Sequence, residues 1–324
     1  YDALTERSGG THAISGLLEN IPALVDVEER LALMERHGVD EHVLVPATPA
    51  VETVADPVGA AELARTANDG IADLVDAHPD RFRGVATVPM NNPEAMVAEV
   101  DRAVTDLGLE GVLLYSSVDN RSADDAHIEG AGRPIDIPAL EPFYERVAAL
   151  DVPIWLHPAR PKTNPDYVGE LESKHLIWQM FGWPFELSAA MARLVFSGLL
   201  DRYDLTVVAH HAGGMVPTLA GRMPIHYDLF EMPGDHYGGA DDPPYVDHFK
   251  QFYVDTATFG SVPALRAAYD FFGPDNLLFG TDAPFDDEGG DRSVRANREA
   301  LAELDVPEEE REDLFAGNVE RLLA

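Results

Sequence analysis

The chain has 324 residues, of which 45% are hydrophobic, so it can bury the core of one large domain or of two ordinary ones. It carries 58 Asp and Glu against 23 Lys and Arg, and this formal net charge of −35 makes nucleic acid a very poor partner. There is no cysteine, which excludes disulfides, thiolate metal ligands and a cysteine nucleophile. Any metal must therefore be held by nitrogen and oxygen ligands.

Acidic residues are spread along the whole chain, as expected of a surface adapted to high salt, where screening reduces self-repulsion. We therefore predict a halophilic protein that needs molar salt for full stability. A docking face for a cationic partner is the alternative. No segment approaches the roughly 18 to 20 consecutive apolar residues of a membrane span, and the first residues lack the pattern of an export signal. We expect a cytoplasmic protein with no membrane partner.

Short β-branched segments alternate with longer segments of helical period, which is typical of repeated βα units around a parallel sheet. Seven strands are predicted, at 41–46, 83–89, 109–115, 153–157, 205–210, 252–256 and 277–281. The predicted amphipathic helices include 27–37, 59–77, 93–107 and 140–150. Residues 307–324 should form two short helices, the second capped near Asn318.

Seven parallel strands are one short of the eight that close a barrel, and the first 26 residues contain no convincing strand. We predict an α/β fold, a (β/α)8 TIM barrel, whose first strand lies wholly or partly upstream of residue 1. An open doubly wound sheet is the alternative, and the lack of an early glycine-rich phosphate turn counts against it. Residues 1–324 are predicted to form a single domain with long loops at 116–138, 158–184 and 223–249, where barrels carry their chemistry.

Polar residues stand at the C-terminal ends of the later predicted strands: His157, His210 with His211, Asp255 with Thr256, and Thr281 with Asp282. In a barrel these ends surround one mouth, so residues far apart in sequence converge there. His210 and His211 are adjacent and should point to opposite sides of a strand, so that at most one faces the centre. Asp282 follows Gly280, which permits close backbone approach, and its alternative role is to cap the next helix.

Imidazole and carboxylate groups together suit zinc, manganese or iron, with a water in the open position. Such a metal lowers the pKa of its water to about 7, and a nearby histidine can then move protons. Two ligands are too few for a tight site, so the missing strand is expected to supply the rest.

Three segments, PIWLHP (153–158), VVAHHAGGMVP (207–217) and LLFGTDAPF (277–285), resemble in this order the decarboxylase-like branch of the amidohydrolase superfamily. This branch includes aminocarboxymuconate-semialdehyde decarboxylases and γ-resorcylate decarboxylases. The likeness extends over most of the chain, including the closing FAGNVERLLA. It implies a metal-dependent barrel enzyme and a homodimer.

The resemblance also implies roles for single residues. His157 binds the metal, and Asp282 binds the metal and its water. In this family, the histidine that transfers the proton is followed by a glycine-rich segment with a proline six positions after the histidine. His211 matches this spacing. His210 is one residue off, and it is expected to orient the residues that contact metal or substrate without touching either. The family's opening Asp-x-His-x-His strand is not in this chain, so the remaining ligands are expected upstream of Tyr1.

Substrate contacts are expected from the loop after the fourth predicted strand. Arg160 can clamp a substrate carboxylate, and an internal salt bridge is its alternative. Trp178, in a cluster with Phe181 and Trp183, can form the wall of a flat pocket or pack a loop or a dimer contact. Phe285 is a further candidate for this wall.

These residues predict a divalent-metal enzyme, with zinc preferred over manganese or iron. It would release carbon dioxide from a small unsaturated or aromatic carboxylate, with His211 transferring the proton. Hydrolysis of a C–O or C–N bond in a lactone or amide at the same site is one alternative. An inactive barrel that serves as a binding or assembly protein is the other.

Overall fold

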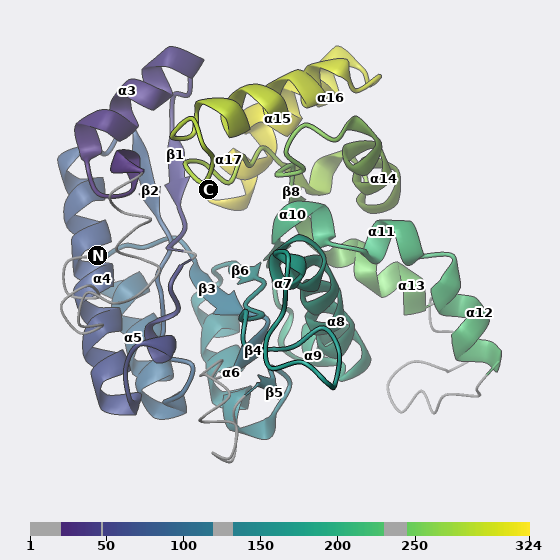
Figure 1. Cartoon of the computed structure of the whole chain (residues 1–324). Coiled ribbons are helices and arrows are strands. Elements are labelled where there is room, and N and C mark those ends of the chain that lie inside the picture. The colour runs from purple at the N-terminus through teal and green to yellow at the C-terminus, as the bar shows by residue number, and fades with distance from the viewer. Residues whose placement is uncertain (1–20, 47, 119–131, 230–244) are drawn as a thin grey trace.

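The computed structural model describes residues 21–46, 48–118, 132–229 and 245–324. In this part of the chain, strands alternate with helices that lie on the outside of the strands (Figure 1). The strands are β1 His42–Leu44, β2 Phe82–Gly84, β3 Val112–Tyr115, β4 Ser117–Val118, β5 Arg133–Pro134, β6 Ile154–His157, β7 Val207–Ala209, β8 Tyr253–Asp255 and β9 Leu277–Leu278. The helices of eight or more residues are α3 Val27–His37, α4 Pro57–Ala77, α5 Pro93–Thr105, α6 Glu141–Leu150, α8 Gly182–Phe196, α12 Arg222–Leu229, α14 Val262–Phe272 and α15 Asp291–Glu303.

The parallel strands lie side by side in the order in which they occur in the sequence. β1 pairs with β2, and β3, β6, β7, β8 and β9 form a five-stranded sheet in that order, with every pairing parallel. A parallel bridge between Ala86 and Val112 links the two sheets. This order of βα units is that of a (β/α)8 barrel, as predicted. The described residues contain seven of its strands, and the place of the first strand upstream of residue 1 stays a prediction.

Each of the seven predicted strand segments contains or overlaps one of these parallel strands, and the predicted helices match α3 to α6 within a few residues. The three predicted loops contain short elements that the sequence pattern did not indicate. β4 and β5 form an antiparallel ribbon after β3, and the loop after β6 contains α7 Ile177–Met180. The segment after β7 continues into α10 His210–Gly213, α11 Val216–Leu219, α12 and α13 Tyr245–His248.

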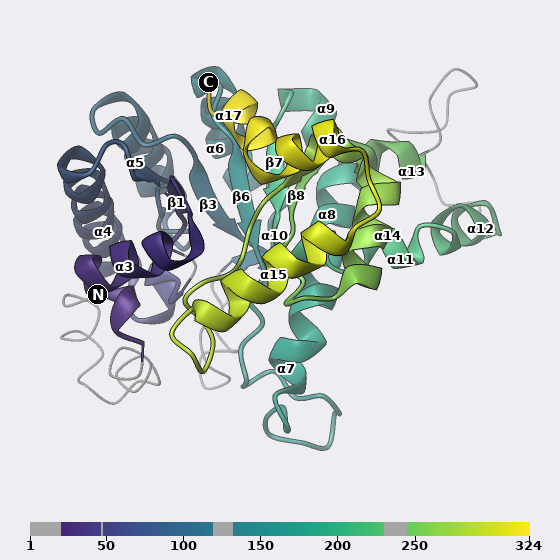
Figure 2. The ribbon, with the colours of Figure 1, turned by 90° about the horizontal axis from the view of Figure 1, so that it is seen from above.

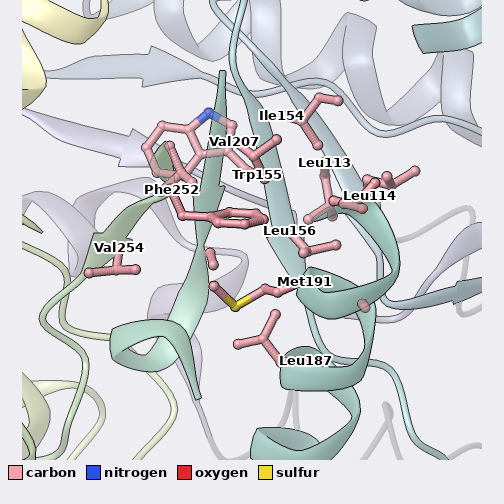
Figure 3. Close-up of a cluster of buried hydrophobic side chains, with 14 of the residues drawn as sticks. Leu113, Leu114, Ile154, Trp155, Leu156, Leu187, Met191, Val207, Phe252 and Val254 are labelled. Carbon is pink, nitrogen blue, oxygen red and sulfur yellow. The ribbon is translucent and has the colours of Figure 1, made fainter. Parts of the chain in front are cut away.

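The core lies between the parallel strands and the helices that cover them. Figure 3 shows buried side chains of β3, β6, β7 and β8 gathered with Leu187 and Met191 of α8. All of β3 and β6 is buried, as expected of parallel strands that are covered on both faces. The main hydrophobic cluster includes residues from Ala50 to Leu314, and two smaller clusters lie beside α4. The extent of the domain over residues 1–324 stays a prediction.

The C-terminal segment differs from the predicted pair of capped helices. α16 Glu308–Glu312, a π-helical turn at Asp313–Gly317 and α17 Asn318–Leu322 follow one another directly. The prediction of a cap near Asn318 is wrong: its side chain caps no helix, and its Nδ2 instead donates to the carbonyls of Pro274 and Leu277, at 2.8 and 2.7 Å. Asn318 therefore bonds the start of α17 to the residues at the start of β9.

None of the helices in the described part of the chain has both the length and the apolar character that a membrane span requires.

Candidate active site at the barrel mouth

His157 ends β6, and its side chain is 3% exposed. Its Nδ1 lies 2.7 Å from the carbonyl oxygen of Pro158. Because a carbonyl can only accept, Nδ1 carries the proton and Nε2 is the basic nitrogen of the neutral ring. This tautomer suits a metal ligand.

The rings of His210 and His211 both lie beside His157, with centroids 5.0 and 5.6 Å from its own. The expectation that they point to opposite sides is therefore wrong. β7 ends at Ala209, and His211 and Ala212 take left-handed φ values of 51° and 55°, so the alternation of a strand no longer applies. Three imidazoles thus meet at one point of the barrel mouth.

The glycine-rich segment after His211 is required by close packing. A side chain at Gly214, where φ is 62°, would meet the carbonyl oxygen of Pro184 at 2.7 Å and Oγ of Ser188 at 2.8 Å. Ser188 Oγ also accepts from the backbone N–H of Met215 at 2.8 Å. α8 therefore holds the turn that carries His211, a contact that only glycine allows.

Asp255 ends β8, is buried, and received no role from the sequence. Its Oδ1 accepts from the backbone N–H groups of Ala212 and Ala257, at 3.2 and 2.9 Å. A side chain at Gly280 would meet Asp255 Cβ at 2.8 Å, which confirms the predicted close approach at Gly280. Asp255 thus fixes the turn next to His211 and acts electrostatically on His210.

Asp282 follows β9 and takes a left-handed φ of 57°. It does not cap the next helix. The backbone N–H groups of Gly290 and Ser293 at the start of α15 donate instead to Asp286, at 3.0 and 2.7 Å. Asp282 is electrostatically coupled to both His211 and Asp255, so the end of β9 belongs to the same group of side chains.

Burial sets the protonation of this group. Burial, together with His210 and His211, lowers the pKa of His157 well below its ordinary value, although the bond to Pro158 acts against this. Burial also lowers the pKa of His210, while Asp255 acts against that change. Burial raises the pKa of Asp282 to about 6, His211 acts against the rise, and Asp255 adds to it. The lowered pKa values thus favour the neutral form of the buried His157 and of the partly buried His210.

The donors suit a divalent metal in kind but are too few to hold one. His157 offers Nε2 and Asp282 offers a carboxylate, which are common ligands of zinc and manganese. Among the described residues, no three His, Asp or Glu side chains form a cluster that could hold a metal ion. Further ligands are needed, as the sequence indicated, and the expected ones lie outside the described residues.

Arg160 lies in the loop after β6 and bonds within that loop. Its Nη2 donates to the carbonyls of Asn164 and Pro165, at 3.3 and 3.1 Å, and lies 4.0 Å from Asp166. The pair with Asp166 is an internal salt bridge, which is the alternative considered for Arg160.

The aromatic cluster of the same loop is smaller than predicted. Trp178 and Trp183 contact each other with ring centroids 5.5 Å apart, and Trp183 contacts His157 at 5.5 Å. Phe181 is 68% exposed and takes no part in this contact. Phe285 is partly buried, and its backbone N–H donates to the carbonyl of Asp282 at 3.1 Å.

Further residues position the site without a signal in the sequence. The ring of Phe259 stacks on His211, with centroids 6.1 Å apart and planes at 23°. Asn297 of α15 is fully buried, and it accepts from the backbone N–H of Thr258 at 3.1 Å while it donates to the carbonyl of Thr281 at 3.3 Å. It therefore ties the loop after β8 to the end of β9.

Glu186 of α8 performs a similar task between β3 and β6. Its Oε2 accepts from Ser116 Oγ at 2.6 Å and from the backbone N–H of Ala159 at 3.0 Å. No regular spacing in the sequence relates these three residues, so only the fold brings them together.

A cavity of about 470 Å³ lies elsewhere, between α4 and α5. Its lining includes Asp69, Asp73, Asp76 and Asp106 and none of the histidines described above. It is separate from the barrel mouth.

Comparison with known proteins agrees with this geometry. The model of the amidohydrolase family matches residues 22–324. The chain is 33% identical over 273 residues to a γ-resorcylate decarboxylase of Polaromonas sp., covering 81% of this chain and 78% of the relative. It is 31% identical to the γ-resorcylate decarboxylase of Rhodococcus jostii, covering 81% and 79%.

Solved structures give the same result. A 2,6-dihydroxybenzoate decarboxylase from Rhizobium superposes with a TM-score of 0.80 at 28% identity, covering 98% of this chain and 94% of the other. A dihydroxybenzoic acid decarboxylase from Polaromonas sp., described with bound manganese and the inhibitor 2-nitroresorcinol, gives a TM-score of 0.81 at 28% identity, covering 99% and 92%. The chain belongs to the amidohydrolase family.

Proposed function

We propose that this chain is a metal-dependent decarboxylase of small aromatic carboxylates. The observation that carries the proposal is the meeting of His157, His210 and His211 at the ends of β6 and β7, together with the partly buried Asp282, whose pKa His211 lowers electrostatically. The activities named for its relatives, γ-resorcylate and 2,6-dihydroxybenzoate decarboxylation, support this substrate class.

His211 is proposed to transfer the proton. Its two ring nitrogens are buried and have no hydrogen-bond partner among the described residues, so either can face a reactant. In the reaction, the imidazolium donates a proton to the ring carbon that bears the carboxylate. The C–C bond then breaks, carbon dioxide leaves, and the electron pair of that bond returns to the ring. A proton from solvent restores the imidazolium.

Nε2 of His157 and the carboxylate of Asp282 are proposed to hold the metal, together with ligands outside the described residues. When bound, a divalent metal polarises and orients substrate oxygens. Zinc is the metal proposed from the sequence. Manganese and iron suit the same donors, and manganese is supported by the Polaromonas structure. Metal analysis of the purified protein would choose among them.

The aromatic rings around the histidines suit a flat substrate. Trp183 contacts His157 edge-on and Phe259 stacks on His211, so aromatic rings border two of the three histidines. Trp178 and Phe285 are proposed to extend this wall. Arg160 is proposed to bind the substrate carboxylate. To do so, its guanidinium must break its hydrogen bonds to the carbonyls of its own loop.

Three properties of the whole protein are proposed on more general grounds. A homodimer is proposed from the family resemblance, and a sedimentation measurement would test it. The halophilic character is proposed from the net charge of −35, and the melting temperature should then rise with potassium chloride up to molar concentration, whereas a fall would contradict it. The predicted cytoplasmic location stays a prediction that fractionation of the source cells would test.

The reaction is tested with purified protein supplied with manganese or zinc and a panel of hydroxylated benzoates that includes 2,6-dihydroxybenzoate. We expect release of carbon dioxide in equal amount to the decarboxylated product. A parallel panel of lactones and amides tests hydrolysis. Folded, metal-loaded protein that hydrolyses these and releases no carbon dioxide would favour the hydrolase, and protein that retains no metal and turns over neither panel would favour an inactive barrel.

A further inference from the structure

One peptide group at the barrel mouth lies between His157 and a carboxylate. Nδ1 of His157 donates to the carbonyl oxygen of Pro158 at 2.7 Å. The N–H of the same peptide, that of Ala159, donates to Oε2 of Glu186 at 3.0 Å. Because this peptide is trans, its C=O and N–H point in opposite directions, so the imidazole and the carboxylate lie on opposite sides of it. Two hydrogen bonds thus connect Glu186 to His157 through one peptide.

Ser116, the residue after β3, strengthens the carboxylate end of this connection. Its Oγ accepts from the N–H of Ala159 at 3.0 Å, and its own hydrogen is donated to Oε2 of Glu186 at 2.6 Å. The second distance is typical of a hydroxyl that donates to an ionised carboxylate. Ser116 is 5% exposed and His157 is 3% exposed, so water competes little with these bonds. The N–H of Ala159 therefore has two acceptors, and one of them carries a charge.

α8 holds Glu186 in this place. Leu187 and Met191 of α8 are completely buried and gather with Leu156 of β6 (Figure 3). α8 also lies beside α10, which carries the two other histidines of the site (Figure 2). Glu186 directly precedes Leu187, so the packing of the apolar side chains of α8 also fixes the position of the carboxylate.

A peptide group can pass polarisation from one of its ends to the other. Its electrons are delocalised between nitrogen and oxygen, so a carboxylate at the N–H increases the negative charge on the carbonyl oxygen. The carbonyl of Pro158 then accepts more strongly from Nδ1 of His157, and Nε2 becomes a stronger electron donor. Carboxylates that bond directly to a metal-binding histidine act in this way, and their loss weakens metal binding by about 10-fold to 100-fold.

We propose that Glu186 is a positioning residue that acts on His157 through the peptide between Pro158 and Ala159, and that its charge strengthens the bond from Nε2 to the metal. The inference rests on the proposed role of His157 as a metal ligand. A Glu186 that only supported the fold could be replaced by glutamine, whose amide oxygen also accepts from Ser116 and Ala159. The two roles therefore differ in the effect of the charge alone.

The first test compares manganese binding by the whole chain in wild type and in Glu186→Gln. The electron paramagnetic resonance signal of the free ion measures the affinity. Glu186→Gln should bind manganese about 10-fold more weakly, because the acceptor stays and the charge is lost. The matched control is Glu303→Gln, which removes the same charge at an exposed position of α15 and should bind manganese as wild type does.

A second test needs no metal and reads the hydrogen bond at His157 itself. With isotopically labelled histidine, nuclear magnetic resonance should show the Nδ1–H proton of His157 downfield, identified by its absence in His157→Asn. This signal should move upfield in Glu186→Gln. It should stay in place in Ser188→Ala, because Ser188 Oγ accepts from the N–H of Met215 at 2.8 Å and belongs to the turn after His211. A signal that Glu186→Gln leaves unmoved would overturn the route through the peptide.

A third reading uses wild type alone and does not depend on how any variant folds. The amide proton of Ala159 should also resonate downfield, as expected of a donor to a carboxylate, and an ordinary position would overturn the inference. Manganese binding separates the two levels of the argument. Wild type that binds the ion no better than His157→Asn would overturn the proposed metal site and the inference with it. Wild type that binds it, with Glu186→Gln equal to wild type, would overturn the inference alone.

Discussion

The indole of Trp183 packs against the imidazole of His157, with ring centroids 5.5 Å apart and planes at 72°. Its Nε1 donates to the carbonyl of Arg160 at 3.0 Å. One side chain therefore connects the loop after β6 to the histidine at the end of β6. Groups that hold a metal-binding histidine in place commonly matter to activity although they touch no metal.

Replacement of Trp183 should lower activity through the position of His157. We expect Trp183→Leu to lower kcat/KM by about 10-fold to 100-fold, since groups that orient a metal ligand have effects of this size. Trp183→Phe keeps a ring against His157 and loses only the bond to Arg160, so its loss should be smaller. Steady-state kinetics with a melting curve for each variant checks this. Equal activity of wild type and the Leu variant would contradict it.

The two adjacent histidines should differ in their effect on catalysis. His211→Asn removes the proposed proton donor, and kcat should fall by about 100-fold or more. His210 donates from Nδ1 to the carbonyl of Leu156 at 2.9 Å, so His210→Asn should act mainly through local packing and lower kcat less. Both variants should keep the circular dichroism of wild type. A larger loss in kcat for His210→Asn would reverse the assignment.

Metal removal should abolish activity and change the tryptophan fluorescence. The chain has three tryptophans, Trp155, Trp178 and Trp183, and all lie in the ring cluster around His157 and His210. Fluorescence of the whole chain therefore reports on this site. We expect a chelator to shift the emission and added manganese or zinc to restore it.

The control for metal removal is His157→Asn, which should lower the metal content of the purified protein and remove the fluorescence response. Full activity in protein that is free of metal by elemental analysis would contradict the metal assignment.

The sequence was sufficient to predict the order of strands and helices in the barrel, because parallel strands covered on both faces form apolar segments such as PIWLH. It also placed His157, His211 and Asp282 at strand ends, where the fold brings polar residues together. The roles assigned to them stay predictions.

Other features depended on contacts that the sequence does not carry. The rings of His210 and His211 lie together because His211 takes a left-handed φ, which no alternation rule anticipates. Asn297 and Asn318 bond to backbone carbonyls 16 and 41 residues away, at Thr281 and Leu277. Such partners are chosen by the tertiary fold, and neither asparagine stands out in its own segment.

A surface ion pair should contribute little to stability although it joins distant elements. Arg36 of α3 and Asp291 of α15 are 255 positions apart. Nε and Nη2 of Arg36 donate to the two carboxylate oxygens of Asp291 at 3.1 and 3.0 Å. Both side chains are partly exposed, so Asp291→Asn should lower the free energy of unfolding by less than about 1 kcal/mol, and by less still in molar salt.

Asp287→Asn is the matched control for this ion pair. It breaks a local and more exposed pair with Arg292 and should leave stability unchanged. Denaturation in urea measures both variants, and a loss above about 2 kcal/mol at Asp291 would show that solvent screens the pair far less than its exposure indicates.

The free energy of unfolding should decrease as the pH falls, because His42 is harder to protonate in the folded protein than in the unfolded chain. Burial lowers the pKa of this residue to about 3, with Arg30 adding to the effect, and its Nδ1 is buried without a hydrogen-bond partner among the described residues. In the unfolded chain the imidazole titrates near pH 6.5. The unfolded state therefore binds more protons between about pH 6.5 and pH 3, and the free energy of unfolding declines as the pH falls through this window.

His42→Leu removes this contribution and should flatten the decline. The pKa values of His157 and His210 are lowered in the same direction, and their effect is common to both proteins, so the comparison isolates His42. Urea denaturation at about pH 7 and about pH 5 measures the difference, and the variant should lose less stability than wild type between the two. Equal losses would mean that the imidazole of His42 is protonated in the folded protein as readily as in the unfolded chain.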